Sequence, residues 1–239
     1  GARYFPDTEN SELQTPVYPG FSRPFFVYRT PQTHILPASC RKPHGGEFKN
    51  SNLDAIAAFD KKISRGLNPT KLPTLLLLMG DQIYADDVDP MLARWLQDTA
   101  AELFPDEGLP GGSSLSATRR KDRSEILRKK DGFYSSYGTH HLIGFSEFAT
   151  MYLAVWGGLQ PTFAEPTPPS NVSRRHKQRA QRKFQQEKRE YDRLKAFFDE
   201  SPRVRRLLAH IPSYMQIDDH EVTDDWNLTK RISERLRRQ

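Results

Sequence analysis

Short apolar runs alternate with amphipathic stretches along this chain, and the runs end in polar residues. Residues 74–79 (TLLLLM) are continuously apolar, which is typical of a strand buried on both faces. Runs at 33–40 (THILPASC) and 213–217 (SYMQI) predict two further strands, and 25–30 (FFVYRT) predicts a fourth. Helical spacing of apolar positions predicts helices at 51–67, 88–104, 144–156 and 203–211, whereas the Gly- and Ser-rich residues 109–121 predict a loop.

The strand at 33–40, the helix at 51–67 and the strand at 74–79 form a predicted βαβ unit. The two strands of such a unit are parallel, and the fold class is therefore α/β. Parallel strands end at one edge of their sheet, which is where ligands bind in open α/β folds. We therefore expect the polar segments that follow three strands to converge there: ASCRKPHG, GDQIYADD and DDHEVTDDWN.

The converging segments bring together groups that bind metal ions. Carboxylates crowded at one edge repel one another unless a cation lies between them. A thiolate, a phenolate, carboxylates and an imidazole together suit a redox-capable or trivalent metal beside a harder ion such as calcium or magnesium. The candidate residues are Cys40, Asp81, Tyr84, Asp218, Asp219 and His220.

Each candidate also has a purely structural interpretation. Cys40 can be a small apolar residue, Gly80-Asp81 a turn, and Tyr84 a half-buried ring with its hydroxyl in water. Asp218 and Asp219 can cap a helix, and His220 can be a surface or core histidine. Three such clusters, each at the end of an apolar strand, favour a common site.

The distribution of charge and the composition bear on the possible partners and on the cellular compartment. Residues 174–195 hold ten Lys or Arg against three acids, a net +7, which leaves −1 of the total +6 for the rest of the 239-residue chain. We interpret 159–200 as an insertion, a Pro-rich linker followed by a basic helix. This helix either lies free in solvent or contacts nucleic acid or an anionic surface. The single cysteine excludes an intrachain disulfide, and no apolar run approaches a membrane span. The first residues lack the apolar core of a signal peptide, so we expect a cytoplasmic protein.

Three segments together resemble the PhoD-like alkaline phosphatases, a branch of the calcineurin-like metallophosphoesterases: ILPASCRKPHGG, LLLLMGDQIYADDVDPML and IDDHEVTDDWNL. The resemblance covers about residues 24–228. It implies one partial domain over 1–239, a β-sheet sandwich flanked by helices, with a binuclear site of Fe³⁺ and Ca²⁺. The family pattern places Cys40 and Tyr84 on the ferric ion and Asp81 between the metals. Asp219, with its neighbour Asp218, falls among the remaining ligands.

The resemblance also implies an activity, the metal-dependent hydrolysis of phosphate mono- or diesters. Its catalytic residues are Asp81 and His220, of which His220 contacts the phosphate and stabilises or protonates the leaving oxygen. We expect Arg41 and His44 to hold the phosphate, and Asp86 and Asp87 to support the site or cap a helix. Two alternatives stay open: a non-catalytic fold that binds polyanions or nucleic acid through the basic helix, and a metal site that is purely structural.

The chain departs from the family pattern near its end. The family carries a GDxH-like metal-binding segment on a later strand, and no such segment follows residue 81 here. The ending LTKRISERLRRQ has the pattern of an unfinished helix. We therefore expect a fragment that lacks the C-terminal strands and some metal ligands, with an incomplete second sheet and an exposed apolar surface. We expect such a fragment to bind metal weakly and to have low activity alone.

Overall fold

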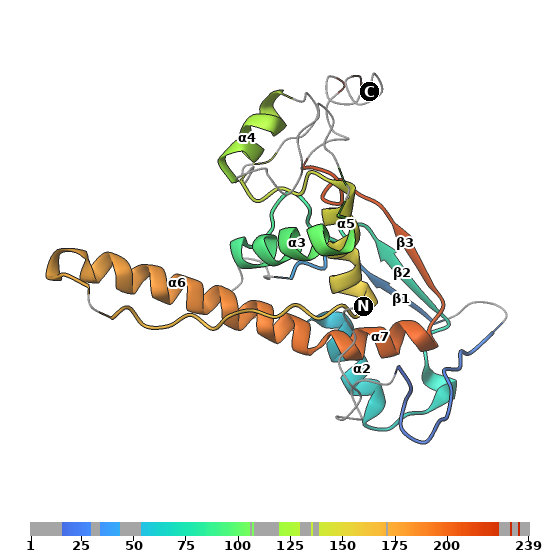
Figure 1. Ribbon diagram of the computed structural model, residues 1–239. Helices are drawn as coiled ribbons and strands as arrows, with labels where there is room; N and C mark the ends of the chain where they lie inside the picture. Colours follow the sequence, from blue (N-terminus) through green and yellow to red (C-terminus); the bar gives the residue numbers. More distant parts are fainter. Residues whose placement is uncertain are drawn as a thin grey trace.

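A parallel β-sheet with helices packed against it forms the body of the computed structural model (Figure 1). The structure describes residues 16–29, 34–43, 54–105, 107, 120–129, 135, 139–170, 172–224, 230 and 234. The three strands are β1 (Ile35–Ala38), β2 (Leu75–Met79) and β3 (Ser213–Gln216), in the order β1-β2-β3. Both pairs are parallel, which confirms the predicted α/β class.

Helices connect and cover the strands, and most of them lie where the apolar spacing predicts. Asp54 caps the first of them by accepting hydrogen bonds from the backbone nitrogens of Ile56 (3.0 Å) and Ala57 (3.3 Å). A short 3₁₀ turn (Pro69–Lys71) precedes β2, and a π-helical turn (Leu153–Gly157) extends α5. The helices are α2 (Ala55–Ser64), α3 (Pro90–Leu103), α4 (Arg120–Lys129), α5 (Phe145–Tyr152), α6 (Arg174–Asp199) and α7 (Ser201–His210).

Two local predictions need correction. Residues 25–29 are not a strand, because the Phe25 ring packs 4.9 Å from the ring of His210 instead of entering the sheet; residue 30 lies outside the described residues. Helix α4 was not predicted, and its first two residues fall in the expected loop 109–121. Its buried Arg123, which pairs with Glu147, supplies a tertiary contact that local sequence spacing does not reveal.

One face of the sheet carries the core and the other is open. On β2, Leu76 and Leu78 are buried, whereas Met79 on the opposite face is 55% exposed. Tyr214 of β3, level with Leu77 on that same face, is 69% exposed. The strand predicted to be buried on both faces is therefore fully buried on one. The described residues contain no second sheet, so the expected sandwich is not seen among them.

Helix α6 extends away from the sheet, and the segment 159–170 runs beside it (Figure 1). Lys188 of α6 bonds Glu165 of that segment at 3.0 Å, and the rings of Phe163 and Phe198 lie 6.1 Å apart. The long basic helix is thus present as predicted. Among the described residues, no helix combines the length and hydrophobicity needed to cross a membrane.

Candidate metal centre

The ends of β1 and β2 meet at the carboxylate of Asp81. The Cys40 sulfur lies 3.2 Å from Asp81 Oδ2, and the Tyr84 hydroxyl donates to the same oxygen at 3.0 Å. Two backbone hydrogen bonds hold the strand ends together beyond the sheet. Cys40 N donates to Gly80 O (3.2 Å), and Arg41 N donates to Asp81 O (3.0 Å). Three of the predicted metal ligands therefore lie side by side.

The other oxygen of Asp81 is buried without a partner. Among the described residues, Oδ1 makes no hydrogen bond, although Asp81 is only 8% exposed. A buried carboxylate oxygen with no hydrogen bond is costly, and a bound cation is one of the few partners that offsets the cost. This atom is the strongest single indication that the edge of the sheet holds an ion.

Backbone strain accompanies these contacts. Cys40 (φ 58°) and Asp81 (φ 53°) both adopt the left-handed region, which residues other than glycine rarely occupy. Such residues each cost about 1–3 kcal/mol and cluster at functional sites, where the surroundings hold them in place. Both residues in this conformation lie at the meeting point of the two strand ends, where the Cys40 sulfur contacts the Asp81 carboxylate.

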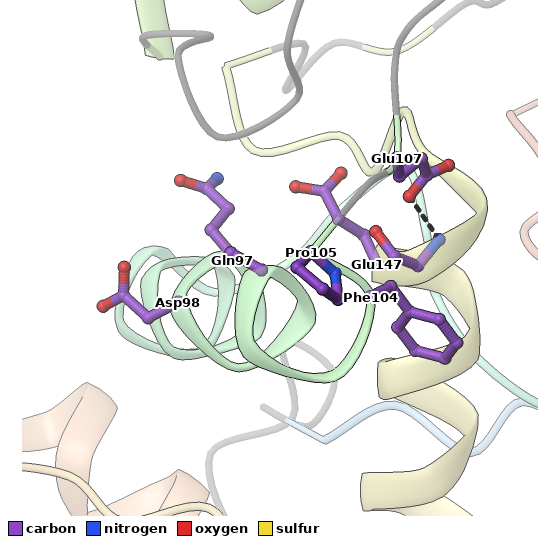
Figure 2. A pocket seen from close by; sticks show the side chains of 8 residues that line it. Gln97, Asp98, Phe104, Pro105, Glu107 and Glu147 are labelled. Atoms are coloured by element: carbon purple, nitrogen blue, oxygen red, sulfur yellow. Dashed lines mark hydrogen bonds between the residues drawn. The ribbon is translucent and has the colours of Figure 1, made fainter.

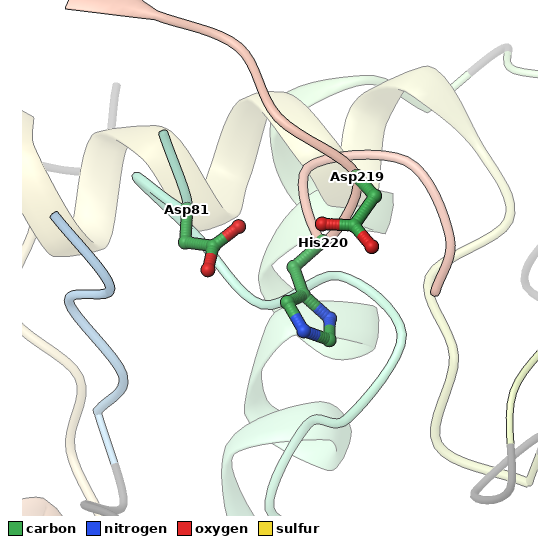
Figure 3. A group of neighbouring side chains, drawn as sticks. All are labelled: Asp81, Asp219 and His220. Atoms are coloured by element: carbon green, nitrogen blue, oxygen red, sulfur yellow. The ribbon is translucent and has the colours of Figure 1, made fainter. Parts of the chain in front are cut away.

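The loop after β3 completes the group. Figure 3 shows Asp81, at the end of β2, facing Asp219 and His220 of this loop. One ligand atom from each of the three lies within 4.8 Å of the others. A second group with the same spacing, Asp86, His220 and Asp224, shares His220 with the first. Two adjoining cation positions are therefore geometrically available.

Asp86 fixes the orientation of His220. Its two carboxylate oxygens lie 3.0 Å from His220 Nδ1, and the imidazole stacks on the Tyr84 ring at 4.5 Å. A proton on Nδ1 donated to Asp86 leaves Nε2 as the nitrogen that can contact a metal ion or, when it is protonated, an oxygen of a substrate. Burial lowers the pKa of His220, but the negative charges of Asp86, Asp81 and Asp219 together raise it overall.

Burial also raises the pKa values of two neighbouring acidic groups, the Tyr84 phenol and the Asp86 carboxyl. The pKa of Tyr84 is raised by burial first and then by the negative charges of Asp81 and Cys40. Burial likewise raises the pKa of Asp86, although His220 counters it. An added positive charge at this edge would favour the ionised form of each group.

Glu221, which the sequence analysis did not single out, holds the loop after β3 against the end of β2. Its buried carboxylate accepts hydrogen bonds from the backbone nitrogens of Asp81 (3.2 Å), Asp218 (2.9 Å) and Gln82. Position gives the one available signal, because this glutamate directly follows the predicted histidine in the DDHE segment. It is a positioning residue, since it contacts backbone rather than the space between the ligands.

The two residues predicted to bind phosphate have different outcomes. Arg41 is buried, with Nε 2.7 Å from Asp54, and its guanidinium lies over the rings of Trp156 (4.5 Å) and Phe197 (4.4 Å). Another nitrogen donates to the carbonyl of Val155. These contacts tie Arg41 into the core and do not support a phosphate contact. His44 lies outside the described residues.

The other acidic residues near the site, Asp218, Asp86, Asp87 and Asp89, have different surroundings. Asp218 is exposed and packs beside Gly80, outside both three-residue groups. Asp86 supports His220, as expected of a neighbouring acid, whereas Asp87 pairs with Lys42. The cap of α3 is Asp89, whose side chain accepts from Met91 N at 2.8 Å.

A small pocket of about 110 Å³ lies elsewhere, between α3 and α5 (Figure 2). Two of its three acids are already engaged, because Glu107 accepts from Ser146 N at 2.8 Å and Glu147 pairs with Arg123. The pocket shares no residue with the strand ends and adds nothing to the candidate site.

Comparison with protein-family models, with curated proteins and with solved structures finds no match for this chain.

Proposed function

We propose that this chain carries the metal-binding site of a PhoD-like phosphatase that hydrolyses phosphate mono- or diesters. The observation that supports it most directly is the Asp81 carboxylate. One of its oxygens contacts Cys40 and Tyr84, and the other is buried with no hydrogen-bond partner among the described residues. Asp219 and His220 lie within ligand distance. These residue types, gathered from three strand ends, supply part of the ligand set that a binuclear site needs.

The donor set fits the two ions that the resemblance implies. Cys40 and Tyr84 would hold Fe³⁺ with Asp81, because sulfur and phenolate ligands suit it, and Asp81 with Asp219 would hold Ca²⁺ through oxygen. Asp218, also a candidate ligand, is exposed beside Gly80 and lies outside both three-residue groups, so the proposed ligand set does not require it. Bound metals would supply the Lewis acidity that activates water and neutralises phosphate charge.

His220 supplies the proton in the proposed reaction. Hydrolysis adds the oxygen of water to phosphorus and breaks the ester P–O bond, and the departing oxygen then needs a proton. The carboxylates of Asp86 and its acidic neighbours raise the pKa of His220 despite its burial, which favours the protonated imidazole. In this role His220 contacts the substrate through Nε2 and does not bind a metal. Solvent then restores the proton to the imidazole.

The open face of the sheet supports the finer fold assignment. A β-sandwich needs an apolar face on each sheet. Ile35, Met79 and Tyr214 present such a face, on the side away from the helices. A second sheet packed on these residues is therefore part of the proposal.

Metal content, absorption spectrum and hydrolysis of p-nitrophenyl phosphate and bis(p-nitrophenyl) phosphate test the proposal together. We expect bound iron and a phenolate-to-iron charge-transfer band, which Tyr84→Phe abolishes. The matched control is Tyr28→Phe, which removes the hydroxyl of a tyrosine that is 74% exposed and should leave the band intact.

Activity gives the second half of the test. Asp81→Asn should lower hydrolysis at least about 100-fold, because it removes a ligand charge at the centre of the site. Iron with its band but no ester hydrolysis would leave a structural metal site. Neither iron nor a band nor hydrolysis would overturn the proposal as a whole.

A further inference from the structure

The positive charge of α6 is concentrated in the half that extends from the body. Residues 174–183 carry six Lys or Arg and no acid, whereas 184–199 carry four of each. Figure 1 shows that the first half is the end farthest from the sheet, and the second half leads into α7. The half of α6 next to the body therefore has no net charge, whereas the half that extends from the body is strongly cationic.

Four of the six arginines of α6 follow one face of the helix. Arg175, Arg179, Arg182 and Arg189 follow the i, i+4, i+7, i+14 spacing that places side chains above one another on an α-helix. We name these four residues the arginine stripe. All four are exposed, and none forms an ion pair with any residue that the structure describes. Between the first and the last, the stripe spans about 21 Å at 1.5 Å per residue.

Three lysines of the same helix, Lys177, Lys188 and Lys195, lie on the opposite face, and two of them are paired. Lys188 bonds Glu165 at 3.0 Å, and Lys195 bonds the aspartate four residues further along at 2.6 Å. The segment 159–170 runs along that face. One side of the helix is therefore largely neutralised within the chain, while the arginine stripe faces solvent with its charge uncompensated.

We propose that the arginine stripe binds the phosphate backbone of a nucleic acid. Guanidinium groups pair with phosphate in a two-pronged geometry, and a row of them one helical turn apart matches a polymer of phosphates better than a single anion. The residues between the arginines on this face are Gln178, Gln185 and Gln186, so it offers no apolar side chain to enter a membrane. The stripe includes no residue of the metal centre and does not depend on catalysis.

Fluorescence anisotropy with a labelled 30-nucleotide random-sequence duplex and single strand, titrated over a range of salt, tests the stripe. The test variant is Arg175→Gln/Arg179→Gln/Arg182→Gln in the full chain. The control is Lys177→Gln/Lys188→Gln/Lys195→Gln, which removes the same charge from the opposite face of the same helix. Circular dichroism and thermal melting check that both variants fold, which is expected because the substituted arginines are exposed.

We expect the unmodified chain to bind, with affinity that falls steeply as salt rises. The arginine variant should bind at least about tenfold more weakly at 100 mM salt. Its salt slope on duplex should be shallower by about 2–3, because each phosphate that the variant no longer neutralises removes about 0.9 from the slope. The control should bind less than about threefold more weakly, through long-range charge alone.

Three outcomes would overturn the proposal. The first is that the unmodified chain binds neither nucleic acid. The second is an equal decrease in affinity for both variants, which would make net charge and not the stripe responsible. The third is tighter binding to phosphatidylserine vesicles than to nucleic acid, abolished in the arginine variant, which would assign the stripe to a membrane surface instead.

Discussion

Gly80 lies where the end of β2 passes closest to the loop after β3. Its φ of +114° suits glycine, and a Cβ added there would lie 2.6 Å from the Cβ of Asp218. We predict that Gly80→Ala lowers the free energy of unfolding by about 2–4 kcal/mol, because backbone strain and a steric clash add. It should also weaken metal binding, since it moves the two strand ends apart. Urea unfolding and metal titration measure both effects.

Gly20→Ala separates the two causes. Gly20 also has a positive φ, +85°, but no atom lies within 4 Å of the added Cβ. This control should cost about 1 kcal/mol from backbone strain and leave metal affinity unchanged. Equal destabilisation by the two alanines would show that contact with Asp218 does not limit the site.

Glu221 supports the site through backbone hydrogen bonds, and Glu221→Gln tests that role. The amide keeps the shape of the side chain but replaces one accepting oxygen with a donor, which leaves buried N–H groups of β2 and the β3 loop unpaired. We expect a decrease of about 1–3 kcal/mol in stability. Metal affinity should fall about 10- to 100-fold, as for other residues that orient ligands.

The matched control is Glu187→Gln on α6, whose partner Lys183 lies 3.5 Å away at the surface. It should change stability by less than about 0.5 kcal/mol. Unaltered metal affinity in Glu221→Gln, despite reduced stability, would mean that Glu221 holds the fold together without positioning the ligands.

At the scale of elements, buried polar contacts join α4, α5 and the loop after β3. Arg123 of α4 bonds the carbonyl of His141 at 3.0 Å and pairs with Glu147 of α5. The His141 ring contacts Thr223 of the loop, with Nε2 3.1 Å from Oγ1. Burial, with Arg123 adding to it, lowers the pKa of His141 from 6.5 to about 4.

This shift predicts how stability depends on pH. The unfolded chain gains a proton on His141 near pH 6.5, and the folded chain gains it only near pH 4. Stability is therefore complete above about pH 6.5 and declines as the pH falls toward 4, by about 2 kcal/mol between pH 7.5 and 5. His141→Gln should remove that part of the decline in urea unfolding. His176→Gln, on the exposed part of α6, should keep it, and a variant profile parallel to the unmodified one would contradict the assignment.

The pattern of apolar residues along the chain predicted the strands and helices whose apolar side chains are buried in the core. The apolar runs indicated β1, β2 and β3, and the helical spacing indicated α2, α3, α5 and α7. It failed where tertiary contacts decide. Residues 25–29 have strand-forming side chains, yet Phe25 packs on His210, and α4 is stabilised by the burial of Arg123.

The candidate site also combines features that the sequence predicts with features that depend on tertiary contacts. Parallel strands bring Cys40, Asp81 and Tyr84 together, and that convergence follows from topology. The support from Glu221 to backbone nitrogens depends on where the β3 loop turns, which spacing does not show. Arg41 was expected at the phosphate because it follows Cys40, but the positive φ of Cys40 and the bond to Asp54 direct it into the core.

At the scale of the whole molecule, the sheet that the structure describes has one covered face and one open face, and two adjacent residues of β2 show the difference. Leu78 is 2% exposed on the covered face, whereas Met79 is 55% exposed on the open face. Leu78→Ala should cost about 2–5 kcal/mol, because it leaves a cavity in the core. Met79→Ala should cost less than about 1 kcal/mol, because its side chain already contacts water in the folded chain. Urea unfolding of the two variants measures the difference.

The same open face should govern association. Ile35, Met79 and Tyr214 expose apolar side chains on this face, and contiguous apolar surface of this kind promotes contact between copies. Met79→Ser/Tyr214→Ser should therefore reduce concentration-dependent association in sedimentation experiments without lowering the urea midpoint. If Met79→Ala instead destabilises the chain as much as Leu78→Ala, the open face is covered in solution. The layer that covers it would then contribute to the stability of the sheet and to the position of Asp81 at its edge.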